Sequence, residues 1–328
     1  MLQLLNDIPA MDPYFDATFF GWFSILASRI FSLHRTEIFA DEIQLIVMGL
    51  FALSASFLGV LLVLKRLTMM ANALSHTMLL GIVVALMMTV SFQGQAIEFL
   101  TPPNLAIIVS SVLIGLLTGF LTEQLARVRT LKEDACNGMV FSALFALGVT
   151  LLSVWSRNAH AGVELLMGDP DALQTGDIPI VFYGACLTLA IGCLFLRGFS
   201  VAIFDTSFAQ MSGFRPSFLH HLLLAQVALT SISAFRAVGF VMTLAFFVIP
   251  PLIARLWTKS LRPLLVTSMA VGVGTVVLAV ALGRHLLSAY YLPVSTGALA
   301  AVLLGILYAG ALCIRELRRR ARATLTAP

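Results

Sequence analysis

The stretch that decides the fold is K-R-L-T-M-M-A-N-A-L-S-H-T-M-L-L-G, from Lys65 to Gly81. Two cations open it, and the charge-free run from Leu67 to Ile97 is long enough to cross a bilayer as a helix. Two polar side chains inside this run, Asn72 and His76, are four residues apart and therefore share one helical face. His76 would stand roughly 15 Å along the helix from Arg66, near mid-bilayer. An imidazole at that depth needs a partner or a water-filled path, so it is a candidate functional residue.

The composition indicates a membrane protein. Of the 328 residues, 59% are hydrophobic and 11% are charged, and the mean hydropathy is +0.98. Soluble domains carry about 25% charged residues, so we expect one membrane domain and no large soluble one. The net charge of +4 does not indicate a nucleic-acid partner, because the basic residues alternate with apolar runs and form no single patch.

Nine charge-free runs follow Glu42, and each can hold a membrane-spanning helix. They cover residues 43–64, 67–97, 99–122, 135–156, 178–196, 216–235, 237–254, 263–283 and 285–314. If Lys65 and Arg66 are cytoplasmic and the runs alternate in direction, 15 of the 20 Lys and Arg residues fall on the cytoplasmic side. This asymmetry follows the positive-inside rule. It predicts an all-α transmembrane bundle of about nine spans, with the N-terminus outside and the C-terminus inside.

The segment before the first run, residues 1–42, is predicted to contain an amphipathic helix. Its large apolar residues share one helical face: Phe15, Phe19, Trp22, Leu26 and Ile30. We expect this helix to lie on the membrane surface, with a tenth span as the alternative. The transmembrane permease domain would then cover residues 43–314, and residues 315–328 would form a basic cytoplasmic tail.

Two positions in the later runs predict breaks in helices. Only Arg236 separates the runs 216–235 and 237–254, so either two helices meet in a tight turn between Arg236 and Gly239 or one helix is broken within the membrane. Pro250 and Pro251 predict that the second helix kinks or ends there, because proline removes a donor and clashes with the preceding turn.

The predicted cytoplasmic loop 197–215 contains F-D-T-S-F-A-Q-M-S-G-F. Asp205 can cap a short helix, Phe208 and Met211 share a face, and Gly213 can end it. Such a helix with exposed apolar side chains is a docking element for a soluble partner. The alternative is a helix that holds the loop against the membrane surface.

The candidate metal ligands are His76 and Asn72. Imidazole suits transition metals and an amide oxygen is a weak, hard ligand, so two such donors fit a transient site that releases its ion. The alternative is a hydrogen bond between helices. The remaining histidines are weaker candidates because they lie in loops or at the ends of runs: His34, His160, His220, His221 and His285.

The chain lacks the sequence motifs of several other functions. It has no G-x-x-x-x-G-K-[ST] loop, so we expect no nucleotide hydrolysis by this chain, and any ATPase would be a separate polypeptide. It has no H-E-x-x-H motif, and we predict no catalytic residue and no enzymatic activity. No Asp or Glu lies within the nine runs, which argues against an ion-gradient-driven secondary transporter.

Four stretches, in order, resemble one known family. L-G-V-L-L-V-L-K-R-L-T-M-M-A-N-A-L-S-H-T-M-L-L-G (Leu58–Gly81) is similar to the opening of the ABC-3 family, the membrane permeases of bacterial zinc, manganese and iron importers. Glu133–Val149 resembles the fourth helix of that family, Phe204–Gly213 its cytoplasmic coupling segment, and Arg236–Leu256 its late V-G…P-A-A-x-A segment. The similarity extends from Gln44 to Leu312.

The resemblance implies an all-helical permease of the type II importer class, in a bacterial inner membrane. Two permease subunits, identical or related, would pair with two cytoplasmic ATPases and receive the ion from an extracytoplasmic metal-binding protein. It implies no permanently bound cofactor, since the divalent ion, Mn, Zn or Fe, is the cargo. It also implies that His76 and Asn72 occupy the metal site of the pathway, and that Asp205, Phe208, Met211 and Gly213 belong to the segment that couples to the ATPase.

The sequence departs from the family pattern at the candidate site. Asn72 stands where the family has an aspartate, so the charge of a divalent ion is less neutralised, and Leu80 replaces the usual proline. Both changes fit a non-identical partner subunit or a different metal. The function we expect is therefore that of a permease subunit of an ATP-driven divalent-metal importer. The alternatives are a permease for metal chelates of the siderophore or vitamin type and a secondary transporter.

Overall fold

The computed structural model describes residues 13–14, 18–31, 38–93, 104–129, 132–156 and 170–325, and all regular structure within them is helical. The elements are α1 (Phe19–Phe31), α2 (Ala40–Lys65), α3 (Thr68–Gln93), α4 (Asn104–Arg129), α5 (Glu133–Ser156), η2 (Pro170–Ala172), α7 (Asp177–Leu194), α8 (Leu196–Phe204), α9 (Thr206–Met211), α10 (Pro216–Trp257), α11 (Leu261–Tyr290) and α12 (Thr296–Leu325). The predicted all-α class is confirmed.

Seven helices among the described residues are long and apolar enough to cross a membrane: α2, α3, α4, α5, α7, α11 and α12. An eighth apolar helix, Met242–Trp257, is shorter and forms the second part of α10. The chain is therefore a multi-pass membrane protein. The predicted count of about nine spans is not exact, because the runs 216–235 and 237–254 both fall within α10.

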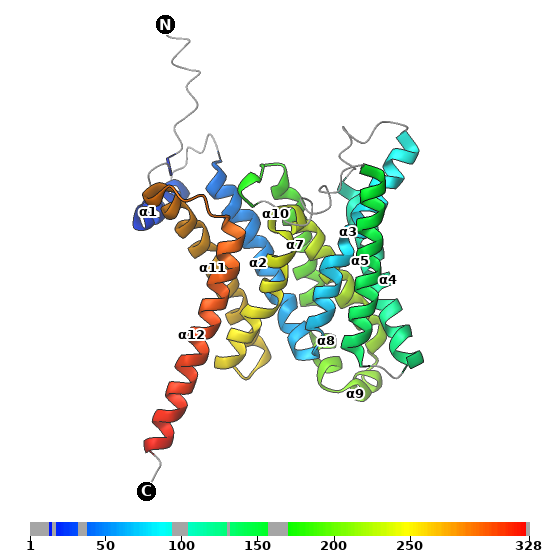
Figure 1. Cartoon of the computed structure of the whole chain (residues 1–328). Coiled ribbons are helices and arrows are strands. Elements are labelled where there is room, and N and C mark those ends of the chain that lie inside the picture. The colour runs from blue at the N-terminus through cyan, green and yellow to red at the C-terminus, as the bar shows by residue number, and fades with distance from the viewer. Residues whose placement is uncertain are drawn as a thin grey trace.

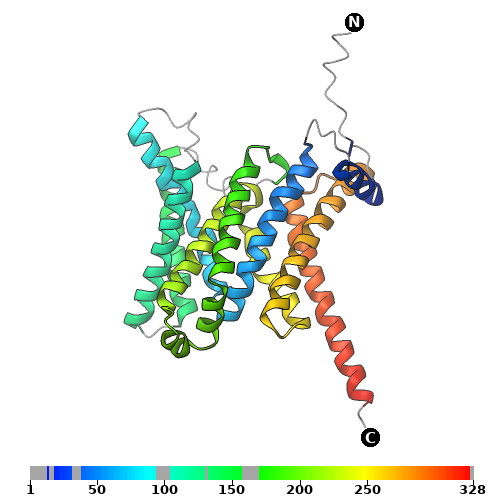
Figure 2. The ribbon, with the colours of Figure 1, turned by 180° about the vertical axis from the view of Figure 1, so that it is seen from behind.

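The two ends of the bundle carry different elements. Figure 1 shows α1 at one end, and α8, α9 and the C-terminal part of α12 at the other. Figure 2 shows the same arrangement from behind. The end with α9 also holds the turn at Arg66, between α2 and α3. This separation agrees with the predicted topology, in which Arg66, α9 and the basic tail are cytoplasmic.

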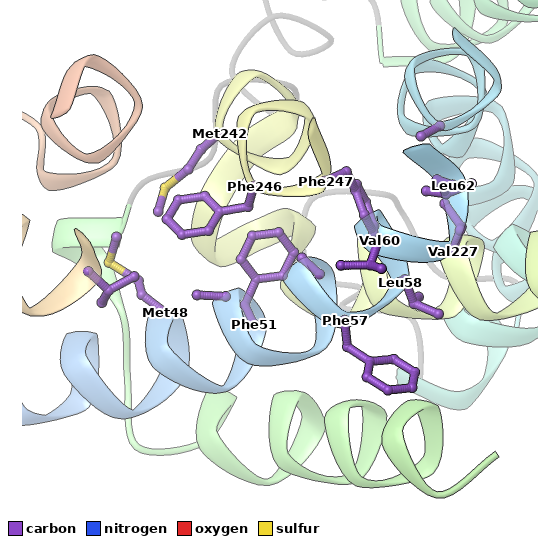
Figure 3. Close-up of a cluster of buried hydrophobic side chains, with 14 of the residues drawn as sticks. Met48, Phe51, Phe57, Leu58, Val60, Leu62, Val227, Met242, Phe246 and Phe247 are labelled. Carbon is purple, nitrogen blue, oxygen red and sulfur yellow. The ribbon is translucent and has the colours of Figure 1, made fainter. Parts of the chain in front are cut away.

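Helix α2 lies at the centre of the bundle and α12 at its edge. In the apolar 18-residue stretch of α2, 78% of the residues are buried inside the protein, and in that of α12 only 22% are. The core between α2 and α10 is aromatic (Figure 3), and the rings of Phe51 and Phe246 meet edge to face with centroids 5.9 Å apart. Because lipid tails are as apolar as these side chains, close packing stabilises this contact more than the exclusion of water does.

The break in α10 lies at Gly239 and not at the prolines. Gly239 has φ 69° and ψ 174°, a conformation essentially confined to glycine, and it joins two helical parts without a loop. Pro250 and Pro251 do not end the helix, since both lie inside a helix that continues to Trp257, and a kink at these prolines stays a prediction. The bend falls where a residue without Cβ can adopt the required φ.

A glycine on α2 accommodates the backbone that these prolines disturb. Pro251 has no N–H, so the carbonyl of Phe247, four residues earlier, loses its intrahelical donor. That carbonyl oxygen packs against Gly59, where an added Cβ would lie only 2.2 Å from it. The absence of a side chain at Gly59 therefore leaves room for this carbonyl.

Replacement of Gly59 with alanine is expected to destabilise the protein by about 1–3 kcal/mol, because the new methyl group must push the backbone of Phe247 away. The matched control is Gly49→Ala on the same helix, where nothing lies within 4 Å of the added Cβ. In thermal unfolding in detergent, Gly59→Ala should lower the midpoint and Gly49→Ala should leave it unchanged or raise it. Equal midpoints for the two variants would contradict this account.

At the opposite end from α9, α1 is held to the bundle by buried charges. Trp22 Nε1 donates to Asp41 Oδ2 (3.0 Å), and Arg29 Nε donates to Glu42 Oε1 (2.6 Å). Arg284 of α11 forms a salt bridge with Asp41 (2.6 Å). These contacts connect α1 and α11 to the first turn of α2.

The sequence predicts that the aromatic face of α1 lies on the membrane surface. In the structure, the described residues of this face pack against protein. Trp22 is fully buried, and Phe19 and Leu26 pack on the core, while Phe15 and the side chain of Ile30 lie outside the described residues. The location of α1 at the membrane surface stays a prediction. Burial, reinforced by the charge of Glu42, raises the pKa of Tyr14, whose hydroxyl donates to Glu42 Oε1 (3.0 Å).

Candidate functional site

Asn72 and His76 form a partly exposed strip in the middle of α3, which we call the open strip. Every residue of α3 from Met70 to Val83 is buried except these two, which are partly exposed. Their spacing places them one turn apart on the same face, as the sequence predicts. The described part of the chain therefore leaves the two candidate ligand side chains partly accessible.

Two aromatic rings of α5 bound the imidazole of His76. Phe141 stacks on it, with centroids 5.4 Å apart and planes 24° apart, and Phe145 meets it edge to face at 5.5 Å. Flat rings on two sides limit the orientations that the imidazole can adopt. Phe141 and Phe145 were not predicted as site residues from the sequence. Their four-residue spacing, within a stretch that resembles the family, could have indicated that they share one helical face.

Helix α4 covers the other side of α3. The hydroxyl of Thr118 donates to Thr77 Oγ1 (3.2 Å), and Ser110 Oγ donates to the carbonyl of Gly81 (2.8 Å). Gly81 packs directly against Ser111, where an added Cβ would lie 2.7 Å from the backbone. These contacts fix the rotation of α3, so that Asn72 and His76 stay on its open side.

The described part of the chain does not assemble a complete metal site by itself. No group of three or more His, Cys, Asp or Glu side chains among the described residues lies close enough together to hold an ion. The candidate metal ligands on α3 are thus the imidazole nitrogen of His76 and the amide oxygen of Asn72. Such a pair can coordinate an ion only weakly, which suits transient binding.

The other histidines serve different contacts. His220 Nδ1 accepts a hydrogen bond from Lys65 Nζ (2.8 Å), which places the ring proton on Nε2. His221 Nδ1 contacts the carbonyl of Ser217 (2.8 Å), and its Nε2 lies 3.8 Å from Glu123. The two adjacent rings therefore point to different partners. His285 lies near Tyr290 on α11, and His34 and His160 are outside the described residues.

The predicted coupling segment has the predicted local structure. Asp205 Oδ1 accepts hydrogen bonds from the backbone N–H groups of Ser207 (2.9 Å) and Phe208 (3.0 Å) and so caps α9. Gly213, with φ 83°, follows the end of the helix. Phe208 and Met211 are 56% and 86% exposed. The segment therefore presents two large apolar side chains at the α9 end of the bundle.

The first turn of α10, directly after this segment, is tied to two other helices. Lys65, at the end of α2, bonds to His220, and Glu123 of α4 lies beside His221. A cavity of about 410 Å³ opens here, lined by residues that include Met70, Thr122, Glu123 and His220. Sequence reasoning missed this network, because its pairs lie far apart in the chain, and Lys65 and His220 are 155 positions apart.

Comparison with known proteins gives a consistent result. The model of the ABC 3 transport family matches residues 42–315. A Chlamydia muridarum protein named "Probable metal transport system membrane protein" is 36% identical over 94% of this chain and 96% of its own length. The Bacillus subtilis "Manganese transport system membrane protein MntD" is 31% identical, over 80% of this chain and 88% of that protein. The solved PsaBC complex of Streptococcus pneumoniae shares the fold, with a TM-score of 0.70 at 21% identity over 87% of this chain and 95% of that chain.

Proposed function

Because the chain belongs to the ABC 3 transport family, we propose that it is the membrane permease subunit of an ATP-driven importer of divalent metal ions. The observation that carries this proposal is the open strip on α3, where the described residues leave only Asn72 and His76 partly exposed between Met70 and Val83. A polar strip at mid-helix in a membrane protein marks a pathway for a polar solute. The names of the relatives, for metal and for manganese transport, support a metal ion as that solute.

The cargo we propose is Mn²⁺, Zn²⁺ or Fe²⁺, which the site would bind in transit and not retain as a cofactor. The imidazole of His76 suits zinc and iron, and the amide oxygen of Asn72 suits manganese. Neither donor carries a negative charge, so the ion would bind weakly and leave quickly. A site on a transport pathway needs both weak binding and fast release.

A second permease subunit, identical or related, would complete the site. Two donors are too few to strip a divalent ion of its water, and the described residues provide no cluster of three acidic, thiol or imidazole ligands. The open strip of α3 is where a second copy or a paralogue could add its own ligands. If the paralogue retains a carboxylate at the position of Asn72, the pair would regain the missing charge.

The energy would come from a separate cytoplasmic ATPase dimer that docks on α9. Phe208 and Met211 supply the apolar contact, and Asp205 and Gly213 set the start and end of the helix that presents them. Movement of α9 would pass into α10, and from His220 to Lys65, which ends α2 just before the turn into α3. An extracytoplasmic metal-binding protein would deliver the ion at the opposite end, near α1. The protein would thus lie in a bacterial inner membrane, with residues 1–42 and 315–328 flanking the permease domain.

The test is uptake by the assembled transporter. The permease is co-expressed with its ATPase and binding protein and reconstituted in proteoliposomes, and the uptake of Mn²⁺, Zn²⁺ and Fe²⁺ is measured with each ion as a competitor of the others. We expect ATP-dependent uptake of at least one free ion, and none with a proton or sodium gradient alone. Uptake of a ferric siderophore without free-ion transport would favour the chelate alternative, and gradient-driven uptake without ATP would reject an ABC mechanism.

A further inference from the structure

One buried amide on α5 has an oxygen without a hydrogen-bond partner among the described residues. Asn137 is 2% exposed, and its Oδ1 accepts no hydrogen bond from them. Buried polar side-chain atoms in proteins are nearly always paired, so each exception calls for an explanation, such as an ordered water or an ion. An apolar side chain at this position in a membrane helix would avoid the penalty altogether.

The packing register places Asn137 at the same level along the bundle as the candidate ligand Asn72. Both α3 and α5 start at the α9 end of the bundle and run in the same direction (Figure 1). Phe141 stacks on His76, and one turn of helix separates Asn137 from Phe141, just as one turn separates Asn72 from His76. Asn137 and Asn72 therefore lie at the same level, one turn closer to the cytoplasmic end than the imidazole.

We propose that Asn137 is a further oxygen donor to the transported ion, at the same level as Asn72. This inference rests on the proposed metal transport and adds a residue to the site. An amide oxygen is a hard, neutral ligand of the kind that suits Mn²⁺. Together, the two asparagines would supply oxygen atoms where this chain lacks a carboxylate. An ion that moves from His76 toward the cytoplasm would pass from an imidazole to an oxygen-rich layer.

The decisive variant is Asn137→Leu, which keeps the branched shape of the side chain and removes the oxygen. In the complete transporter, reconstituted with its ATPase and binding protein, we expect ATP-dependent Mn²⁺ uptake at subsaturating concentration to fall at least about tenfold, a typical loss for a disturbed metal site. The thermal midpoint of the variant should stay unchanged or rise, because an unpaired buried amide is gone. A structural role would give the opposite result, with a lower midpoint.

Two further variants sharpen the test. Asn137→Asp keeps an oxygen donor and adds charge, so Mn²⁺ uptake should saturate at a lower concentration than in the natural protein. Ser56→Ala is the matched control. Ser56 is also fully buried, and its hydroxyl has no hydrogen-bond partner among the described residues, but it lies on α2 against Gly272 of α11, away from the site. Its removal should leave uptake unchanged.

The outcomes separate this inference from the proposed function. If the natural protein transports Mn²⁺ and Asn137→Leu transports it equally well, Asn137 is not a ligand and the proposed function stands. If Asn137→Leu loses uptake only in proportion to a lowered thermal midpoint, the role is structural and the inference is again wrong. If the natural protein moves none of Mn²⁺, Zn²⁺ and Fe²⁺, both proposals fall together.

Discussion

Replacement of His76 with alanine is expected to reduce metal uptake by at least about tenfold, equivalent to ~1.4 kcal/mol or more of lost interaction with the ion. The imidazole is the strongest donor on the open strip of α3, and Asn72 alone cannot hold a divalent ion. Alanine keeps the helix intact, because it is the best helix former. The measurement is ATP-dependent uptake of Mn²⁺, Zn²⁺ and Fe²⁺ in proteoliposomes, together with the amount of assembled complex.

The control for this prediction is a histidine outside the strip. His285 lies on α11 near Tyr290, and the variant His285→Ala should transport at the natural rate. A second variant, Phe145→Leu, removes one aromatic wall and keeps the imidazole, so it should retain more uptake than His76→Ala. If His76→Ala accumulates metal as the natural protein does, the open strip of α3 is not the ion pathway.

Local features of this fold could be predicted from single residues. The spacing of Asn72 and His76 predicted that they share one helical face, because helical periodicity depends on sequence separation alone. The cap at Asp205 and the turn at Gly213 followed from the preferences of carboxylates for helix N-termini and of glycine for positive φ. Each of these features depends on contacts within a few residues.

Features that depend on packing between helices could not be predicted. The aromatic walls of His76 require the register of α3 against α5, and no sequence pattern specifies that register. Pro250 and Pro251 lie within a helix, and Gly59, almost 200 residues earlier, makes room for the carbonyl of Phe247 that Pro251 leaves without a donor. The aromatic face of α1 packs on protein because buried partners on α2, such as Asp41, hold it there.

Replacement of Phe208 with aspartate is expected to uncouple the transporter from its ATPase. Phe208 is 56% exposed on α9, beside Met211, and an exposed aromatic side chain on a docking helix is a typical hot spot. A carboxylate there would have to lose its water on docking, so we expect ATPase affinity to fall by about 2 kcal/mol or more, roughly 30-fold. The cap at Asp205 is made by backbone N–H groups, so it should survive the substitution.

The matched control introduces the same charge elsewhere on the same helix. Gln210 is exposed on α9 but is about 200° around the helix from Phe208, so Gln210→Asp should keep both the ATPase and its stimulation. The measurements are the fraction of ATPase that co-purifies with the permease and the stimulation of ATP hydrolysis by the metal-loaded binding protein. If Phe208→Asp retains both, α9 does not transmit the force of ATP hydrolysis, whereas loss in both variants would show that any charge on this loop is disruptive. Loss in Phe208→Asp alone would locate the coupling contact on the face that Phe208 shares with Met211. The next contact to examine between α9 and the metal pathway would then be the hydrogen bond between Lys65 and His220.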